Sequence, residues 1–133
     1  MRTLFLLIFF PVFLGACATF EPQSPEQAVA ERSRARIEAL MDRNYEAAYE
    51  FATPGYRSTE GVIKYTSRWA GVGMWRTADI SSVSCELSDV IDRCTVWLEV
   101  DYQAPGFEPV TTAIDEDWLL IDGEWYLYQK IGE

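Results

Sequence analysis

The spacing of apolar residues along the chain changes from a helical repeat to a repeat of two. Residues 25–41 place apolar side chains at helical spacing, and Ser24 can cap this segment with Pro25 at its first position. Its charged residues, Arg36 among them, are expected around the rest of the helix. We therefore predict a first helix over residues 25–41.

Two shorter helices are predicted next. The first covers residues 45–52, and the turn residues Thr53-Pro54-Gly55 that follow terminate it. Ser58 or Thr59 can cap another helix of about ten residues, which reaches Trp69. The predicted helical part of the chain therefore ends near residue 70.

Apolar and polar residues alternate beyond the helices, which is typical of strands with one buried face. We predict strands over residues 83–87, 94–102, 110–114, 118–121 and 125–128. Asp122 and Gly123 separate the last two runs, and an Asp-Gly pair in this setting is a strong signal for a tight hairpin. The predicted fold class is α+β, with N-terminal helices packed on a curved antiparallel sheet.

The first residues of the chain have the pattern of a secretory leader. Arg2 precedes an uncharged apolar run over residues 4–14, which ends in Leu14-Gly15-Ala16-Cys17. These four residues resemble the bacterial lipobox. The resemblance implies that residues 1–16 are a signal peptide and that Cys17 is lipidated. Residues 17–25 then form the lipidated cysteine and a short tether, and residues 26–131 form the domain.

The same resemblance predicts where the protein is found. Acyl chains on Cys17 make the membrane a partner, because two or three chains give stable anchoring. Ala18 follows the cysteine, where an Asp would favour the inner membrane of enterobacteria. We therefore expect a lipid-anchored protein of the cell envelope, at the outer membrane and facing the periplasm. The alternative is an uncleaved membrane helix over residues 3–20, which Pro11 and Gly15 interrupt.

Charge and composition exclude several classes of function. The chain has a net charge of −10, and an acidic surface repels nucleic-acid phosphates. It contains no histidine, which removes Ser-His-Asp and Cys-His catalysis and the commonest zinc ligand. Gly71 and Gly73 lack the third glycine of a dinucleotide-binding fingerprint. We predict no nucleic-acid partner, no cofactor and no catalytic residue set.

The order of predicted elements resembles the nuclear-transport-factor-2-like superfamily, the cone fold shared with ketosteroid isomerase-like proteins. The likeness rests on residues 39–49 with the turn at 54–57, on the third helix before long strands, and on the hairpin at 118–126. It covers residues 25–130 and implies a cone-like sheet. The family includes isomerases, dehydratases, small-molecule binders and dimerisation modules, so the resemblance does not name a function.

Two cysteines remain after Cys17. Cys85 and Cys94 fall on neighbouring predicted strands, so a hairpin can place them opposite each other. Exported proteins retain disulfides, and closing a loop of ~10 residues stabilises a fold by up to ~2.7 kcal/mol in the chain-entropy model. We predict a disulfide between them. The alternative is a pair of reduced, buried thiols.

Two further groups of residues are candidates for a site. Asp115, Glu116 and Asp117 form the densest acidic cluster, but a calcium ion needs six or more oxygens, so we predict a solvated strand end and no metal. Aromatic residues are candidates to line the interior of the cone, or else simply to fill the core. They are Tyr65, Trp69, Trp75, Trp97 and Tyr102.

Three functions are consistent with these patterns. The first is a non-enzymatic envelope lipoprotein whose cone-like domain binds a protein partner or a second copy of itself. The second is a module that binds a small apolar or aromatic ligand inside the cone. The third is an isomerase or hydrolase that uses a buried carboxylate and a tyrosine.

Overall fold

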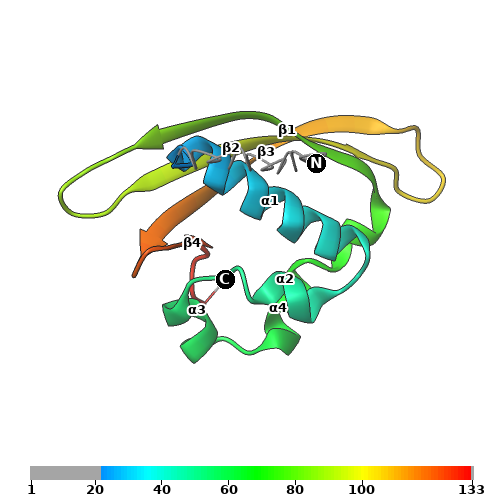
Figure 1. Ribbon diagram of the computed structural model, residues 1–133. Coiled ribbons are helices and arrows are strands. Elements are labelled where there is room, and N and C mark those ends of the chain that lie inside the picture. The colour runs from blue at the N-terminus through cyan, green and yellow to red at the C-terminus, as the bar shows by residue number, and fades with distance from the viewer. Residues whose placement is uncertain (1–21, 133) are drawn as a thin grey trace, which may run out of the picture.

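A long helix, α1 (Pro25–Met41), lies across one face of a four-stranded antiparallel sheet (Figure 1). The computed structural model describes residues 22–132 of the chain. The Ser24 side chain accepts a hydrogen bond from the backbone N–H of Gln27, and the Gln27 side chain accepts one from Ser24 in return. This capping box satisfies two N–H groups at the helix end, and α1 has the bounds that the sequence predicts.

Three short helices and a 3-10 segment complete the helical layer. They are α2 (Tyr45–Tyr49), α3 (Pro54–Thr59), α4 (Val62–Arg68) and η1 (Ala70–Met74). The prediction of one helix starting at Ser58 or Thr59 is wrong. Thr53 instead caps α3 by accepting a hydrogen bond from the backbone N–H of Tyr56. Pro54 begins a helix here because the first helical position needs no N–H donor.

The strands follow the helices in the order β1-β2-β3-β4, and each pairs with its neighbour in antiparallel fashion. Their bounds are β1 (Trp75–Glu86), β2 (Arg93–Tyr102), β3 (Val110–Ile121) and β4 (Glu124–Leu127). The α+β class with helices before an antiparallel sheet is therefore confirmed. The two strands predicted over 110–114 and 118–121 are one continuous strand, because the acidic residues between them also pair with β2.

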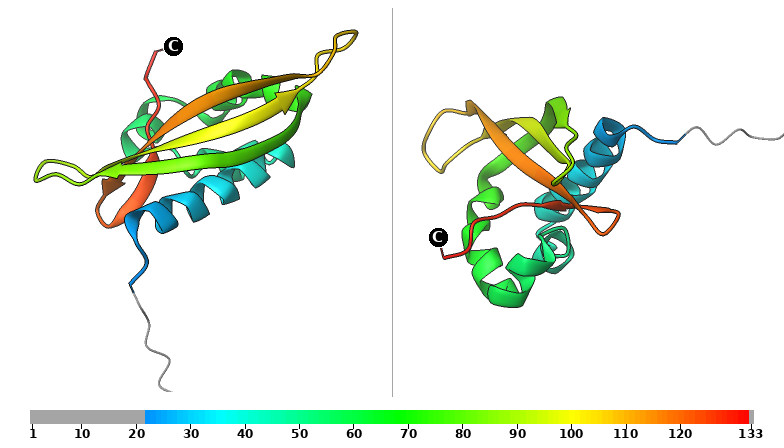
Figure 2. Two further views of the ribbon diagram at one scale, coloured as in Figure 1. Left: turned by 90° about the horizontal axis from the view of Figure 1, so that it is seen from above. Right: turned by 90° about the vertical axis from the view of Figure 1, so that its left-hand side faces the viewer.

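The main core lies between α1 and the sheet (Figure 2). Alternate residues of β2 face the helix and are buried, whereas the residues between them are turned to the other face. The buried members of this core are Val29, Ile37, Cys94, Val96, Leu98, Val100, Trp118, Trp125 and Leu127. A second buried cluster joins α1 to the short helices around Tyr56 and Tyr65.

Cys85 and Cys94 lie opposite each other in the register of β1 and β2, and a disulfide joins them. Cys94 belongs to the buried core, and Cys85 packs against it. The bridge therefore links the two strands on the face of the sheet that α1 covers.

The end of β4 connects the sheet to the helical layer. The Leu127 backbone N–H donates to the Phe51 carbonyl over 2.7 Å, and the Thr53 N–H donates to the Leu127 carbonyl over 3.1 Å. The Tyr128 N–H donates to the Asp117 carbonyl over 2.7 Å, which continues the pairing along β3. This joint holds the segment after β4 beside the edge of β3.

The predicted leader lies outside the described residues. The predicted signal peptide 1–16 and Cys17 are outside the described residues, as is most of the predicted tether 17–25. Within residues 22–132, no helix combines the length and the apolar character that a bilayer span requires.

Candidate functional site

A buried ion pair joins α1 to β3. The guanidinium of Arg36, with no exposed surface, donates through Nη1 to Oε1 of Glu116, which is 4% exposed. The other carboxylate oxygen accepts from the Ser33 hydroxyl over 3.2 Å and from the Trp118 indole N–H over 3.3 Å. The predictions that Arg36 lies on the polar face of its helix and that Glu116 lies at a solvated strand end are both wrong. β3 continues through the acidic cluster and turns Glu116 toward α1.

Arg36 also organises the aromatic residues near it. Its Nε donates to the Tyr65 hydroxyl over 3.2 Å, and its guanidinium carbon lies 4.2 Å from the centre of the Trp69 ring. The Tyr65 hydroxyl donates to the Ala48 carbonyl over 3.1 Å. Burial raises the pKa of Tyr65 above its ordinary value of 10.0, although the charge of Arg36 opposes this shift. The hydroxyl therefore stays protonated at neutral pH and acts as a donor.

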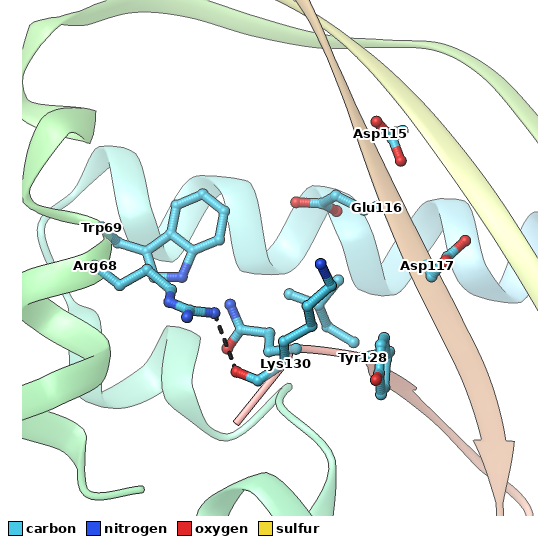
Figure 3. Close-up of a pocket in the computed structure, with 9 residues that line it drawn as sticks. Arg68, Trp69, Asp115, Glu116, Asp117, Tyr128 and Lys130 are labelled. Atoms are coloured by element: carbon cyan, nitrogen blue, oxygen red, sulfur yellow. Dashed lines mark hydrogen bonds between the residues drawn. The ribbon is translucent and has the colours of Figure 1, made fainter. Parts of the chain in front are cut away.

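A cavity of about 370 Å³ lies beside this ion pair (Figure 3). The end of α4, the middle of β3 and the segment after β4 form its walls. Its lining residues are Arg68, Trp69, Asp115, Glu116, Asp117, Leu127, Tyr128, Gln129 and Lys130. Figure 3 shows Glu116 pointing from β3 toward Trp69, whereas Asp115 and Asp117 point to the other side of the strand. Only the middle acid of the cluster therefore faces the inner wall.

Two buried polar atoms on the cavity walls have no hydrogen-bond partner among the residues that the structure describes. They are the indole nitrogen Nε1 of Trp69, a donor, and the amide oxygen Oε1 of Gln129, an acceptor. Gln129 is only 8% exposed. Because buried polar groups are normally hydrogen-bonded, these two atoms offer a donor and an acceptor to a molecule in the cavity.

The predicted cavity-lining aromatic residues lie in different places. Trp69 lines the cavity, and Tyr65 and Trp75 pack against its ring with centroid distances of 6.3 Å each. Tyr65 is fully buried, so it supports the wall from behind. Trp97 is 44% exposed on the sheet face turned away from α1, and Tyr102 lies opposite Trp75 in the strand register. Neither of these two lines the cavity, because β2 carries them away from α4.

The acidic cluster does not form a metal site. Successive side chains of a strand point to opposite faces, so the three carboxylates do not converge. Asp117 is engaged on the outer face, where it accepts from the Thr95 hydroxyl over 2.9 Å and lies 3.8 Å from Arg93. Within residues 22–132, no group of three or more acidic or cysteine side chains is placed to hold a metal ion.

Comparison with known proteins identifies the fold. No protein-family model matches the chain, and no curated protein matches it. A SEC-C motif containing protein from Psychrobacter arcticus superposes with a TM-score of 0.64 at 12% identity, over 84% of this chain and 64% of that one. A SEC-C motif containing protein from Rhodopseudomonas palustris gives 0.55 at 17% identity, over 80% of this chain and 76% of that one. This chain thus spans 64% of the length of the first of them.

A third solved structure is less similar. It is described as that of a proposed polyketide cyclase from Xanthomonas campestris, and it superposes with a TM-score of 0.42 at 13% identity, over 81% of this chain and 94% of that one. That score is too low to establish a shared fold.

These comparisons correct the family resemblance drawn from the sequence. That resemblance described a bacterial lipoprotein with a nuclear-transport-factor-2-like domain, whereas two solved structures that share the fold are those of SEC-C motif containing proteins. The comparisons give no support to a lipoprotein, and the residues Leu14 to Cys17 that resemble a lipobox lie outside the described residues. At 12% and 17% identity, what this chain shares with the SEC-C motif containing proteins is the fold alone.

Proposed function

We propose that this domain binds a small planar ligand in the cavity between α4, β3 and the segment after β4. The observation that carries the proposal is the pair of unpartnered polar atoms, Trp69 Nε1 and Gln129 Oε1, on the walls of one cavity. Leaving a buried polar group without a partner costs about 1–3 kcal/mol, so a ligand that pairs both atoms recovers that cost on binding.

The chemistry of the walls restricts the ligand. The volume of about 370 Å³ lies within the range of roughly 300–1,000 Å³ that small-molecule sites occupy. The positive charge of Arg36 balances the negative charge of Glu116. Among the other lining residues, Arg68 and Lys130 carry positive formal charges and Asp115 and Asp117 carry negative ones, so the wall is neutral overall and favours a neutral ligand. Trp69 supplies an aromatic wall together with its N–H donor. A heteroaromatic ring that carries an amide or lactam group meets these requirements.

We further propose that the curvature of the sheet creates the space in which the ligand binds. In a cone-like sheet, the concave face and the helical layer enclose one space, and the cavity is the part of it that side chains leave open. The proposal places a ligand in this space, with Trp69 as its aromatic contact.

Ligand binding fits the geometry better than acid–base catalysis does. Both oxygens of Glu116 already accept hydrogen bonds, from Arg36 on one side and from Ser33 and Trp118 on the other. The Tyr65 hydroxyl is likewise held between Arg36 and the Ala48 carbonyl. A carboxylate and a hydroxyl with these partners are positioned as structural groups.

The test is a titration of the folded domain with nicotinamide and uracil as neutral planar probes. Binding is followed by tryptophan fluorescence and by the melting temperature. At least one probe is expected to bind, and Gln129→Leu is expected to weaken it about tenfold, because the variant removes the acceptor. Trp69→Phe removes the donor and keeps an aromatic wall, so it is expected to weaken binding by a similar factor.

Trp97→Phe is the matched control, because Trp97 lies on the opposite face of the sheet and its loss leaves the cavity intact. Binding that survives both cavity variants but is lost in Trp97→Phe would place the site elsewhere and overturn the proposal. Absence of binding by every probe would overturn the assignment to neutral planar amides.

A further inference from the structure

Part of β3 forms an open edge of the sheet. β3 has 12 residues, but β4 pairs only with the four from Trp118 to Ile121, and Tyr128 extends this pairing to Asp117. Among the described residues, no strand pairs with β3 on this side from Val110 to Asp115. In the left view of Figure 2, β3 (orange) runs along the margin of the sheet opposite β1.

The backbone groups at this edge can be assigned from the neighbouring hydrogen bonds. The Asp117 carbonyl accepts from Tyr128 on the β4 side, and the Leu120 N–H donates to the Asp92 carbonyl on the β2 side. Backbone groups of successive residues in an antiparallel strand point to alternate sides. The N–H and C=O groups of Ala113 and Asp115 therefore point outward from the open edge, as a ladder without a partner strand.

The side chains along this edge do not prevent another strand from pairing with it. Natural edge strands are usually blunted by Pro, by Lys or by a bulge. The five residues from Val110 to Ile114 read Val-Thr-Thr-Ala-Ile, with no charge and no Pro or Gly, and Val110 is 48% exposed. A segment of this kind is suited to pair with an added extended chain.

Electrostatic charge distinguishes between the two kinds of chain that could pair with this edge, a second copy of this protein and a different peptide. The strand register places a row of acidic side chains on the sheet face turned away from α1, with the basic residue Arg93 beside Asp117. These acids are Asp79, Glu86, Glu99, Asp101, Asp115 and Asp117. A second copy of this chain, with its own net charge of −10, would be repelled, whereas a basic chain is attracted.

The exposed Trp97 favours the same partner. It lies directly opposite Asp115 in the register of β2 and β3 and is 44% exposed, at the centre of the acidic face. A Lys or Arg side chain that reaches over an aromatic ring gains a cation–π contact in addition to the attraction of the carboxylates.

We propose that an extended peptide with Lys or Arg at every second position adds to the sheet as a fifth strand along Val110–Asp115. Its backbone pairs with Ala113 and Asp115, and its basic side chains lie on the acidic face near Asp115 and Trp97. This strand-docking site goes beyond the ligand-binding cavity and shares only Asp115 and Asp117 with its lining.

The test uses a fluorescein-labelled peptide of alternating Lys and Thr, followed by fluorescence anisotropy with the folded domain. A peptide of the same composition with its lysines in one block has equal charge but no alternation. Ala113→Pro removes an outward N–H and leaves the bonds from β3 to β2 in place. We expect Ala113→Pro to weaken binding at least tenfold, Ala113→Val to change it less than twofold, and the block peptide to bind at least tenfold more weakly.

A second measurement keeps the test independent of protein stability. The same alternating peptide with N-methyl groups at every second residue loses the backbone donors on the side that pairs with β3, and it is expected to bind at least tenfold more weakly to the unaltered domain. Equal binding by the alternating, block and N-methylated peptides would show attraction by charge alone and would overturn the proposal. A stable dimer of the domain that Ala113→Pro dissolves would assign the edge to a second copy and would also overturn it. Gln129→Leu is expected to leave peptide binding unchanged, so failure of one proposal does not entail failure of the other.

Discussion

Arg36 on α1 and Glu116 on β3 face each other at the centre of the fold, and both side chains are almost entirely buried. Their contact spans 80 residues of sequence and connects the helical layer to the sheet. Glu116 also accepts hydrogen bonds from Ser33 and Trp118, so its negative charge is compensated on every side that the structure describes. The pair therefore supports one wall of the cavity without adding net charge to it.

Replacing only one partner of this ion pair is expected to destabilise the fold strongly. Glu116→Gln keeps the shape of the side chain but leaves the charge of Arg36 buried without a counter-charge. We expect the free energy of unfolding to fall by about 3–5 kcal/mol, measured by urea denaturation. Replacing both residues with apolar ones, Arg36→Met with Glu116→Leu, is expected to recover much of this loss, because no unpaired charge then remains.

The matched control is the exposed pair between Arg32 and Glu124, whose contact is 3.2 Å and whose Glu side chain is 60% exposed. Glu124→Gln is expected to lower the free energy of unfolding by less than about 1 kcal/mol, because solvent screens the pair. Similar losses for Glu116→Gln and Glu124→Gln would contradict a structural role for the buried pair.

Removing the disulfide is expected to weaken the domain without abolishing the cavity. Cys85→Ala with Cys94→Ala, or reduction of the wild-type protein, should lower the free energy of unfolding by about 2–3 kcal/mol, since the bridge closes a short loop. The measurement is thermal unfolding with and without a phosphine reductant. The double variant should not respond to the reductant, and a wild-type protein equally insensitive to it would contradict the prediction.

The turn between β3 and β4 depends on the backbone freedom of Gly123. Asp122 and Gly123 have φ values of 51° and 83°, the left-handed region that a tight two-residue hairpin requires. Gly123→Ala is expected to cost about 1–2 kcal/mol in the free energy of unfolding, because a Cβ is strained there. Gly55→Ala, in the first turn of α3 with open space around it, should instead be neutral or stabilising by up to about 1 kcal/mol. Equal effects in the two variants would exclude this explanation.

Stability is expected to fall in alkaline solution because of buried tyrosines. Burial raises the pKa of Tyr65 above 10.0, and it does the same for Tyr56. The unfolded chain releases these protons at a lower pH than the folded chain does. The stabilisation is therefore complete below about pH 10 and is lost as the pH rises through the higher pKa of the folded state.

The measurement for this prediction is the urea midpoint of wild type and Tyr65→Phe between pH 8 and 11. The variant is less stable at neutral pH, because it loses the hydrogen bonds to Arg36 and Ala48. Its midpoint should nevertheless fall less steeply with pH than that of wild type. Parallel pH profiles for the two proteins would rule out a contribution from Tyr65.

Local sequence signals were sufficient for some elements and insufficient for the site. Ser24 and Pro25 define the start of α1, and Asp122-Gly123 defines the last hairpin, because each signal acts within a few residues. The burial of Arg36 could not be predicted in this way. A helical arginine is ordinarily solvated, and its counter-charge lies on a strand whose position depends on the whole fold.

No pattern in the sequence identified Gln129 as a site residue, because its burial depends on the hydrogen bonds between the end of β4 and the helical layer. A pattern did exist for Glu116. A single strand over residues 110–121, with side chains alternating between its two faces, places Glu116 on the same buried face as Trp118. The acidic cluster hid that alternation, because three adjacent acids suggest solvent.

The joint at Leu127 has a consequence for how the cavity opens. Its partners, Phe51 and Thr53, lie far from it in sequence, so the entropy of loop closure makes this contact a late step in assembly. Any local opening that separates the segment after β4 from the helices must break these two hydrogen bonds. A cavity ligand should therefore slow amide hydrogen exchange at Leu127 and at Thr53, although Thr53 is not part of the cavity wall.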